Sequence, residues 1–210
     1  MPGPVLRRTG ERRNGSVRRL DLDRPLVDAA LHDLRRFEAL YRKYVAQVYS
    51  FAVYELRDHH AAEDATEAAF LRALVALPRF EERARAARDG TDASTFRVWL
   101  FRIARNVIAN ERRRARRHPA LSLDPLSDGL VSEDAPLEAG AIRRDEAGAA
   151  WAAVARLPDD RRRALTLRFL HEMSTSEIAA VLGRSEGAVR VLIHRALRSV
   201  ARDLDRRGRA

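Results

Sequence analysis

Polar and cationic side chains gather on one face of a predicted helix between residues 185 and 198. Hydroxyl, carboxylate, imidazole and guanidinium groups near the start of such a helix can hydrogen-bond base edges in a major groove, and arginines can also hold phosphates. The sequence therefore indicates duplex DNA as a ligand. The side chains are those of Ser185, Glu186, Arg190, His194, Arg195 and Arg198.

Two helices joined by a tight turn must position this face. Ser174 and Glu177 have the spacing of a capping box, in which each side chain satisfies a free backbone amide at a helix start. The pattern predicts a helix over residues 175–182, a left-handed residue at Gly183 and an N-cap at Ser185. This is a helix-turn-helix pattern, although any three-helix module with a charged last helix shares parts of it. The second helix carries the apolar stripe Val189, Ile193, Ala196, Val200 and Leu204.

The composition favours a polyanionic partner. The formal net charge is +10, and it comes almost entirely from arginine, because Lys43 is the one lysine in the sequence. A genome biased toward arginine and alanine codons would raise the same counts. There is no cysteine, which excludes a disulfide framework and a zinc finger. No apolar run is long enough for a membrane span, so we expect a soluble, cytoplasmic protein.

The chain divides into four predicted parts with an all-α fold. Residues 1–29 combine arginines with glycine, proline and serine, which predicts a disordered basic arm. Residues 30–117 and 141–207 carry helical periodicity and predict two small helical domains. Residues 118–140 contain prolines and acidic residues but no lysine or arginine, which predicts a flexible acidic linker.

The first helical domain is expected to hold three helices around one core. The first carries an aromatic and aliphatic stripe over residues 37–52, and the second runs from about residue 60 to residue 77, since Pro78 would end it. The third spans residues 95–117 and ends in a run of arginines. Its expected buried side chains are Phe96, Trp99, Leu100, Ile103, Ala104 and Val107.

Three segments in this order resemble an extracytoplasmic-function (ECF) sigma factor of the sigma-70 family, an initiation subunit of bacterial RNA polymerase. Residues 62–77 resemble the family's core-polymerase-binding helix, and residues 95–114 resemble the helix that reads the −10 promoter element. Residues 157–204 resemble the −35-binding domain. The resemblance implies that the two helical domains are similar to sigma regions 2 and 4.

The resemblance also implies residue roles. In the second domain, base edges of the −35 duplex would meet Ser185, Glu186, Ala188, Arg190, Val191 and His194, while Arg184, Arg195 and Arg198 would hold phosphates. Arg190 is the favoured guanine contact, with a solvated surface arginine as the alternative. In the first domain, the melted −10 strand would meet Arg105, Asn106, Asn110, Arg112 and Arg113.

Core polymerase would contact the helix that follows residue 62, through Glu63, Asp64, Glu67, Phe70 and Arg72. This helix departs from the family pattern at Ala68 and Ala69, which replace an acid and a threonine. Because these changes remove polar contacts, the resemblance leaves the strength of polymerase binding undetermined. Trp99 is either a core residue or a stacking platform for a base. The loop over residues 81–94 is longer than in most members, and its role is open.

Two other classes of protein remain as alternatives. One is a helix-turn-helix repressor or activator that binds duplex DNA without core polymerase, which would leave the amides and arginines of residues 105–117 unexplained. The other is a metal-dependent hydrolase built on His59, His60, Glu63 and Asp64, although adjacent histidines point in different directions on a helix.

The sequence thus predicts a transcription initiation factor with no catalytic residues, no metal and no cofactor. Its expected partners are core RNA polymerase, promoter DNA and an anti-sigma factor, and it is expected to be monomeric when free.

Overall fold

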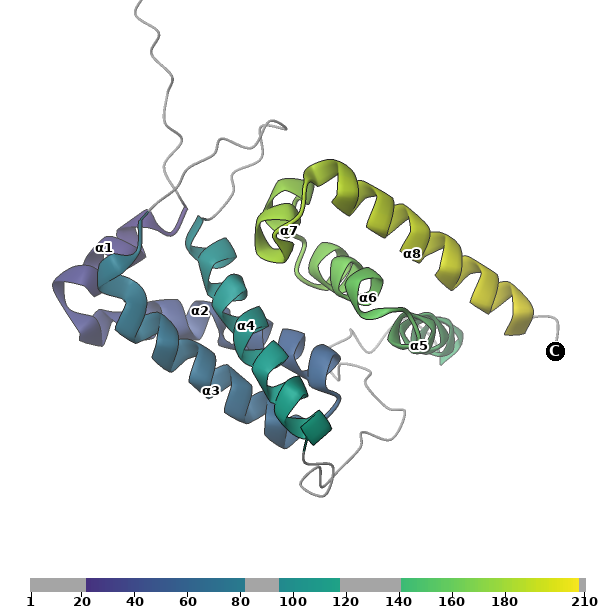
Figure 1. Cartoon of the computed structure of the whole chain (residues 1–210), viewed down its shortest axis with the longest axis horizontal. Coiled ribbons are helices and arrows are strands. Elements are labelled where there is room, and N and C mark those ends of the chain that lie inside the picture. Colours follow the sequence, from purple (N-terminus) through teal and green to yellow (C-terminus); the bar gives the residue numbers. More distant parts are fainter. Residues whose placement is uncertain (1–21, 82–94, 118–140, 208–210) are drawn as a thin grey trace, which may run out of the picture.

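The computed structural model of the chain describes residues 22–81, 95–117 and 141–207 (Figure 1). We refer to the helices of residues 22–117 as the N-terminal domain and to those of residues 141–207 as the C-terminal domain. Every element of these described ranges is helical, which confirms the predicted all-α fold. None of the described helices is long and apolar enough to cross a membrane. The predicted acidic linker, residues 118–140, and most of the long loop, residues 82–94, lie outside the described residues.

The N-terminal domain is built on three long helices that pack on one another. The core of the domain is formed by large side chains such as Leu40, Phe51, Phe96 and Leu100, which are fully buried. The third helix also packs on the C-terminal domain. The elements are α1 (Arg24–His32), the short 3-10 helix η1 (Leu34–Arg36), α2 (Phe37–Leu56), α3 (His59–Ala76), the 3-10 turn η2 (Leu77–Arg79) and α4 (Thr95–Arg117).

Local sequence signals set the ends of α3. The carboxylate of Asp58 accepts a hydrogen bond from the backbone amide of Ala61 at 2.9 Å, which caps the first turn. The helix gives way at Leu77 to η2, which contains Pro78, because a proline removes an amide donor and clashes with the preceding turn. The predicted end of this helix is confirmed to within one residue.

The predicted disordered arm, residues 1–29, is wrong over its last part. Residues 24–29 belong to α1, which has Pro25 in its first turn and buries Val27 and Ala30 against α2. Asp23 precedes the helix and is fully buried, where it accepts hydrogen bonds from Lys43 and Tyr44 of α2. The hydrogen bonds of Asp23 and the burial of Val27 and Ala30 together hold the segment against α2. Residues 1–21 lie outside the described residues.

The C-terminal domain contains the predicted helix-turn-helix. Ser174 and Glu177 form both hydrogen bonds of the capping box, and Gly183 ends α7 in the left-handed conformation with φ of 66°. The side chain of Ser185 accepts a hydrogen bond from the amide of Ala188 at 3.2 Å and so caps α8. All three predictions are confirmed. The elements are α5 (Ala141–Ala155), α6 (Asp159–Leu165), the π-helical turn η4 (Thr166–Leu170), α7 (Thr175–Leu182) and α8 (Glu186–Arg207).

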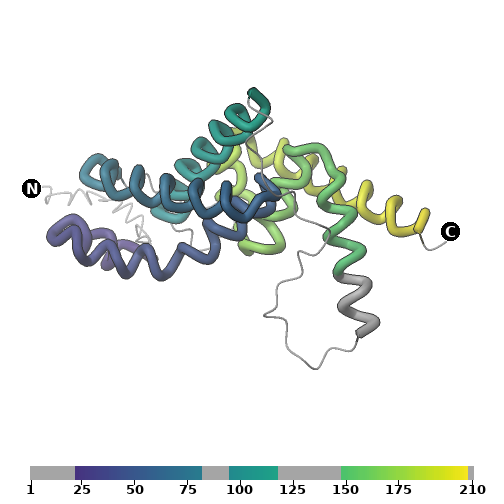
Figure 2. Tube along the Cα trace, turned by 90° about the horizontal axis from the view of Figure 1, so that it is seen from below, coloured from purple at the N-terminus to yellow at the C-terminus, as the bar shows by residue number. Residues whose placement is uncertain are grey.

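The two domains pack directly on each other, a relationship that the sequence did not predict. Figure 1 shows α4 of the N-terminal domain beside α7 and α6, and residues of both domains belong to one continuous hydrophobic core. Figure 2 shows α8 extending from this body toward the C-terminus. The packing matters for function, because it covers one side of the helix for which a DNA role is predicted.

Candidate nucleic-acid interface

The start of α8 presents the predicted duplex-reading face to solvent. Arg190 is 66% exposed in its side chain, and its guanidinium lies 3.3 Å from the carboxylate of Glu186 one turn earlier. This surface pair is weak in water, so it leaves the guanidinium able to turn toward another acceptor. Six further predicted side chains are exposed, namely Arg184, Ser185, Val191, His194, Arg195 and Arg198, while Glu186 and Ala188 are half-buried.

Helix α6 contributes to the position of this face. Arg184, in the turn itself, donates to the carboxylate of Asp160 of α6 at 2.6 Å. The pair is half exposed on both sides. It therefore holds the turn against α6 and still leaves the arginine within reach of a phosphate.

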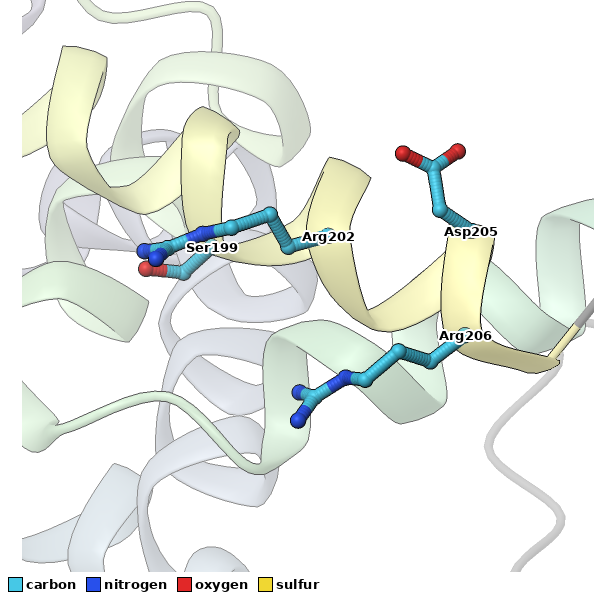
Figure 3. Close-up of a pocket in the computed structure, with 4 residues that line it drawn as sticks. All are labelled: Ser199, Arg202, Asp205 and Arg206. Atoms are coloured by element: carbon cyan, nitrogen blue, oxygen red, sulfur yellow. The ribbon is translucent and has the colours of Figure 1, made fainter.

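The second half of α8 carries further arginines that the sequence analysis did not single out. Figure 3 shows a pocket beside Ser199, Arg202, Asp205 and Arg206, in which the side chains of both arginines extend back along the helix and Asp205 points to another side. The two arginines lean toward the N-terminal end of α8 because helical side chains tilt in that direction. All four lining residues come from a single helix, so the pocket favours an anionic surface contact over a small-molecule site.

Helix α4 has two polar faces, and the predicted single-strand residues are divided between them. One face is exposed and combines amides with arginines at spacings of three and four residues. The side chain of Arg113 donates to the amide oxygen of Asn110 on this face. Arg102 and Arg117 share the face by helical spacing, and the sequence analysis did not single out either of them. The exposed set is Arg102, Asn106, Asn110, Arg113 and Arg117.

The other polar face of α4 is directed at the C-terminal domain and includes the remaining two predicted residues. Arg105 donates to the backbone carbonyl of Val181, near the end of α7, at 2.7 Å. Burial lowers the pKa of Arg105, and repulsion from Arg163 and Arg102 lowers it further. In this structure Arg105 serves as a contact between domains.

Arg112 belongs to a partly buried ion cluster that joins α2, α4 and α6. Its guanidinium lies 3.3 Å from Glu55 and 2.6 Å from Asp159. Arg163 of α6 lies 2.5 Å from the same Glu55 oxygen, and the carboxylate of Glu55 is 2% exposed. A buried carboxylate of this kind needs paired cations, because an unpaired charge in the interior is costly.

The pKa values in this cluster follow the pairing. Burial alone would lower the pKa of Arg163, but its hydrogen bond to Glu55 and the charge of Glu55 outweigh burial, so the pKa is raised. Burial alone would raise the pKa of Asp159, but attraction from Arg112 and Arg162 outweighs it, so the pKa is lowered. The pairing therefore favours the charged forms of both Arg163 and Asp159.

Helix α3 presents an acidic face that continues into apolar side chains. Glu63, Asp64, Glu67 and Arg72 are exposed, as a contact with polymerase requires. Phe70 is 4% exposed, and its ring packs edge-on against Phe37 and Tyr41 at centroid distances of 6.4 and 4.8 Å. Phe70 therefore belongs to the core, and its predicted direct contact with polymerase is not available here.

Helix α3 also carries two exposed apolar residues that the sequence analysis did not single out. Leu71 is 55% exposed and Val75 is 80% exposed, and both follow Glu67 at four-residue spacing. Large apolar side chains on such a face are typical of a surface that a partner covers. The four-residue spacing on the acidic side of the helix was the sequence signal that could have identified them.

Trp99 packs against the core and keeps partial exposure. Its ring centroid lies 5.1 Å from that of Phe80 and 5.5 Å from that of Phe96. These tilted contacts hold the indole in place at the end of α4 that precedes the amide-bearing face. Its predicted core position is consistent with the packing, while its exposed part leaves the stacking alternative open.

The histidines that suggested a metal site have other partners. Nδ1 of His59 lies 2.7 Å from the hydroxyl of Tyr49, and Nδ1 of His60 lies 3.8 Å from Glu63. Within the ranges that the structure describes, no group of three or more metal-ligating side chains comes together. The geometry therefore offers no support for the hydrolase alternative.

Comparison with known proteins gives two family matches in chain order. The family model described as Sigma-70 region 2 matches residues 40–118, and the model described as Sigma-70, region 4 matches residues 147–200. The first match contains α3 and α4, and the second contains the helix-turn-helix.

Individual relatives agree with these matches. The ECF RNA polymerase sigma factor BldN of Streptomyces coelicolor is 33% identical over 166 residues, or 79% of this chain, and the chain spans 59% of the length of BldN. The ECF RNA polymerase sigma factor SigC of Mycobacterium tuberculosis is 31% identical over 179 residues, which cover 85% of this chain and 89% of SigC. A similar fold occurs in the structure of CnrH in complex with the cytosolic domain of CnrY, with a TM-score of 0.62 and 24% identity. The match covers 88% of this chain and 98% of the chain in that structure.

Proposed function

We propose that this chain, which belongs to the ECF group of the sigma-70 family of RNA polymerase sigma factors, directs core RNA polymerase to promoters and initiates transcription. One observation supports this most: a helix-turn-helix with an exposed cationic face and a helix with exposed amides and arginines occur in one chain, in the order of regions 2 and 4. The first suits duplex DNA, and the second suits an unpaired strand.

The −35 element is read by the first turns of α8. Arg190 reaches a guanine edge, and Arg184, Arg195 and Arg198 hold flanking phosphates. Their exposure and cationic character support these roles. Phosphate contacts fix the position of the helix, and the few base contacts set its sequence preference.

The melted −10 strand is held by the exposed face of α4. The amides of Asn106 and Asn110 can hydrogen-bond the Watson–Crick edge of an unpaired base, while Arg113 tracks the backbone. Arg102 and Arg117 lie along the same face and extend the cationic track. Arg105 and Arg112 join this set only when the C-terminal domain leaves α4, because both are bonded to it or to its partners here.

Core polymerase is bound by the exposed face of α3. Glu63, Asp64, Glu67 and Arg72 provide the polar part, and Leu71 and Val75 provide an apolar part. Burial of these two side chains by polymerase would offset the polar anchors that the helix lacks at Ala68 and Ala69. The altered family pattern is thus compatible with a stable polymerase complex.

The protein acts as a subunit in the cytoplasm and contributes no catalytic residue, metal or cofactor of its own. The sigma factor RpoE of Bartonella quintana, which has a similar fold with a TM-score of 0.60, is crystallised with the anti-sigma factor NepR. A regulatory protein of this kind is a partner of the present chain in the proposed function as well. When free, the chain is a monomer.

Run-off transcription with purified bacterial core RNA polymerase tests this function. The template is a fragmented library of the source genome, and the control is core polymerase alone. Discrete transcripts that require the chain support a sigma factor. A band-shift on duplex DNA without polymerase, together with no added transcripts, would support the repressor or activator alternative.

A further inference from the structure

We propose that Val191 reads the C5 methyl group of a thymine in the major groove of the −35 duplex. The inference rests on the proposed function, because it names a base contact of the helix that this function places in the groove. It goes further by assigning one side chain to one chemical group of one base. Val191 thereby selects thymine over cytosine, which has no methyl group at the same position.

Val191 lies on the exposed side of α8 and takes no part in the core. The residue is 48% exposed and belongs to neither hydrophobic cluster of the described residues, whereas Val189 and Ile193 of the same helix do. A valine also forms a helix less readily than an arginine or a glutamate, because its branched side chain loses freedom at χ1. Neither packing nor helix propensity therefore accounts for a valine at this position.

The side chains around Val191 identify the kind of partner. The closest neighbours on a helix surface are three and four residues away. His194 and Arg195 occupy those places toward the C-terminus, Arg190 directly precedes Val191, and all three are exposed. Cationic and hydrogen-bonding groups thus border the valine. This border favours DNA over an apolar protein surface, because phosphates and polar base edges surround each thymine methyl group.

The neighbours of Val191 toward the N-terminus, Gly187 and Ala188, are small. A helical side chain leans toward the N-terminus, so the methyl groups of Val191 lie over the turn that contains these two residues. A Cβ added to Gly187 would meet no heavy atom within 4 Å. The turn therefore leaves open space beside the valine, at the end of the helix that enters a major groove.

Gly187 allows a close approach of the helix to DNA. Among the described glycines only Gly183 has a positive φ, so the backbone at Gly187 does not require glycine. A helix with its side chains is about 10 to 12 Å across and the major groove is about 12 Å wide, so the fit is close. A first turn without a side chain at Gly187 lies deeper in the groove, which brings Val191 to the base edges.

The thymine methyl is the one alkyl group that base pairs present in the major groove. The polar positions there are hydrogen-bond donors and acceptors, and a valine placed over them would leave them without a partner, which costs free energy. Contact between Val191 and the methyl group instead removes apolar surface of both groups from water. An exposed valine on the reading face therefore favours thymine for both reasons.

The test uses the −35 element of a promoter that the full chain activates in run-off transcription. Each thymine of either strand is replaced in turn by deoxyuridine, which pairs with adenine in the same way and lacks only the C5 methyl group. Band-shifts measure the affinity of the holoenzyme for each duplex. We expect one replacement to weaken binding about fourfold, the factor that burial of one methyl group contributes. Equal binding of all the duplexes, or an element without any thymine, overturns the proposal.

Variants of the protein assign the effect to Val191. Val191→Ala removes two methyl groups from an exposed position, so the variant should fold normally. It should bind the unmodified promoter more weakly and lose its response to the sensitive deoxyuridine. Leu197→Ala is the matched control, because Leu197 is 45% exposed on the same helix but lies beyond its first turns, and this variant should keep the response. A full response in Val191→Ala would assign it to DNA shape or to another residue and overturn the proposal.

A second pair of variants tests the close approach. Gly187→Ala adds a methyl group beside Val191, and Gly148→Ala makes the same change in α5, where an added Cβ also meets no heavy atom within 4 Å. Neither variant should lower the midpoint of urea unfolding, because alanine suits a helix better than glycine. Only Gly187→Ala should weaken binding of the holoenzyme to the promoter. Equal promoter binding by the two variants overturns the close approach on which the proposal rests.

Failure of the thymine contact and failure of the proposed function give different results. Chain-dependent transcripts from promoters that tolerate every deoxyuridine would overturn the thymine contact alone. A Val191→Ala variant that keeps its affinity for promoter DNA but loses binding to core polymerase would place Val191 on a protein surface and also overturn it. Absence of any chain-dependent transcript would count against the proposed function and against the contact that rests on it.

Discussion

His171 of the C-terminal domain lies edge-on against Phe101 of α4, with 5.2 Å between the ring centroids. The imidazole is 4% exposed, and its Nε2 has no hydrogen-bond partner among the described residues. Burial, together with the positive charge of Arg97, lowers the pKa of His171 to about 4. The packed arrangement of the domains therefore requires the neutral form of this histidine.

A pH dependence of stability follows from this environment. The ordinary pKa of 6.5 applies when the histidine is exposed, so the exposed state takes up a proton first as the pH falls. Stability is unaffected above about pH 6.5, declines between pH 6.5 and 4, and loses at most roughly 3 kcal/mol from this group. Urea unfolding at pH 7.5 and 4.5 measures the loss, and His171→Leu should reduce it. An equal loss in the leucine variant would assign the pH dependence to other groups.

Arg190 should confer preference at one base pair of the −35 element. Arg190→Ala is expected to cost about 1 to 3 kcal/mol of discrimination at that position, because a guanidinium can make two hydrogen bonds to guanine. Transcription from promoters randomised at −35 measures the preference. Arg206→Ala, at the distal end of the same helix, is the control. Uniform weakening across all sequences would mark Arg190 as a phosphate contact.

Asn106 should act in promoter opening. Asn106→Ala removes an exposed amide from the face of α4 that we propose holds the melted strand, so open-complex formation should fall more than initial docking. Permanganate reactivity of unpaired thymines measures opening, and a band-shift with holoenzyme measures docking. Because Asn106 is exposed, the variant should fold normally. A variant that loses docking and opening to the same extent would not fit this role.

Leu71 and Val75 should contribute to polymerase binding without contributing to stability. Leu71→Glu or Val75→Glu is expected to weaken binding to core polymerase and to leave urea unfolding unchanged, since both side chains are exposed. Leu34→Glu makes the same change at a residue that is also 55% exposed but lies in η1, and it should bind normally.

Phe70 should show the opposite behaviour. Phe70→Ala removes a buried ring that packs against Phe37 and Tyr41, and it is expected to cost about 3 to 5 kcal/mol of unfolding free energy. Its effect on polymerase binding would then follow from the loss of folded protein. Normal stability with a selective loss of polymerase binding would restore Phe70 as a direct contact.

The sequence alone determined the local structure of the helix-turn-helix. Ser174, Glu177, Gly183 and Ser185 act within one or two turns of the backbone, so their types and spacing specify the caps and the turn wherever the domain lies. The periodicity of α8 likewise identified its exposed face, because an apolar stripe on one side leaves the polar residues on the other. The order of the family-like segments indicated the function.

Only the tertiary structure decided how α4 is used. The sequence predicted one buried stripe through Trp99 and Ile103, but α4 also buries Phe101 and Ile108. The ring of Phe101 packs against Phe51 of α2 and His171 of the C-terminal domain, and α7 packs on α4. Arg105 and Arg112 lie on that side, and Asn106 and Asn110 do not. Tertiary packing likewise ordered residues 24–29 and buried Phe70. Contacts between segments distant in sequence fix these outcomes, and periodicity within one helix cannot show which of its faces another domain will cover.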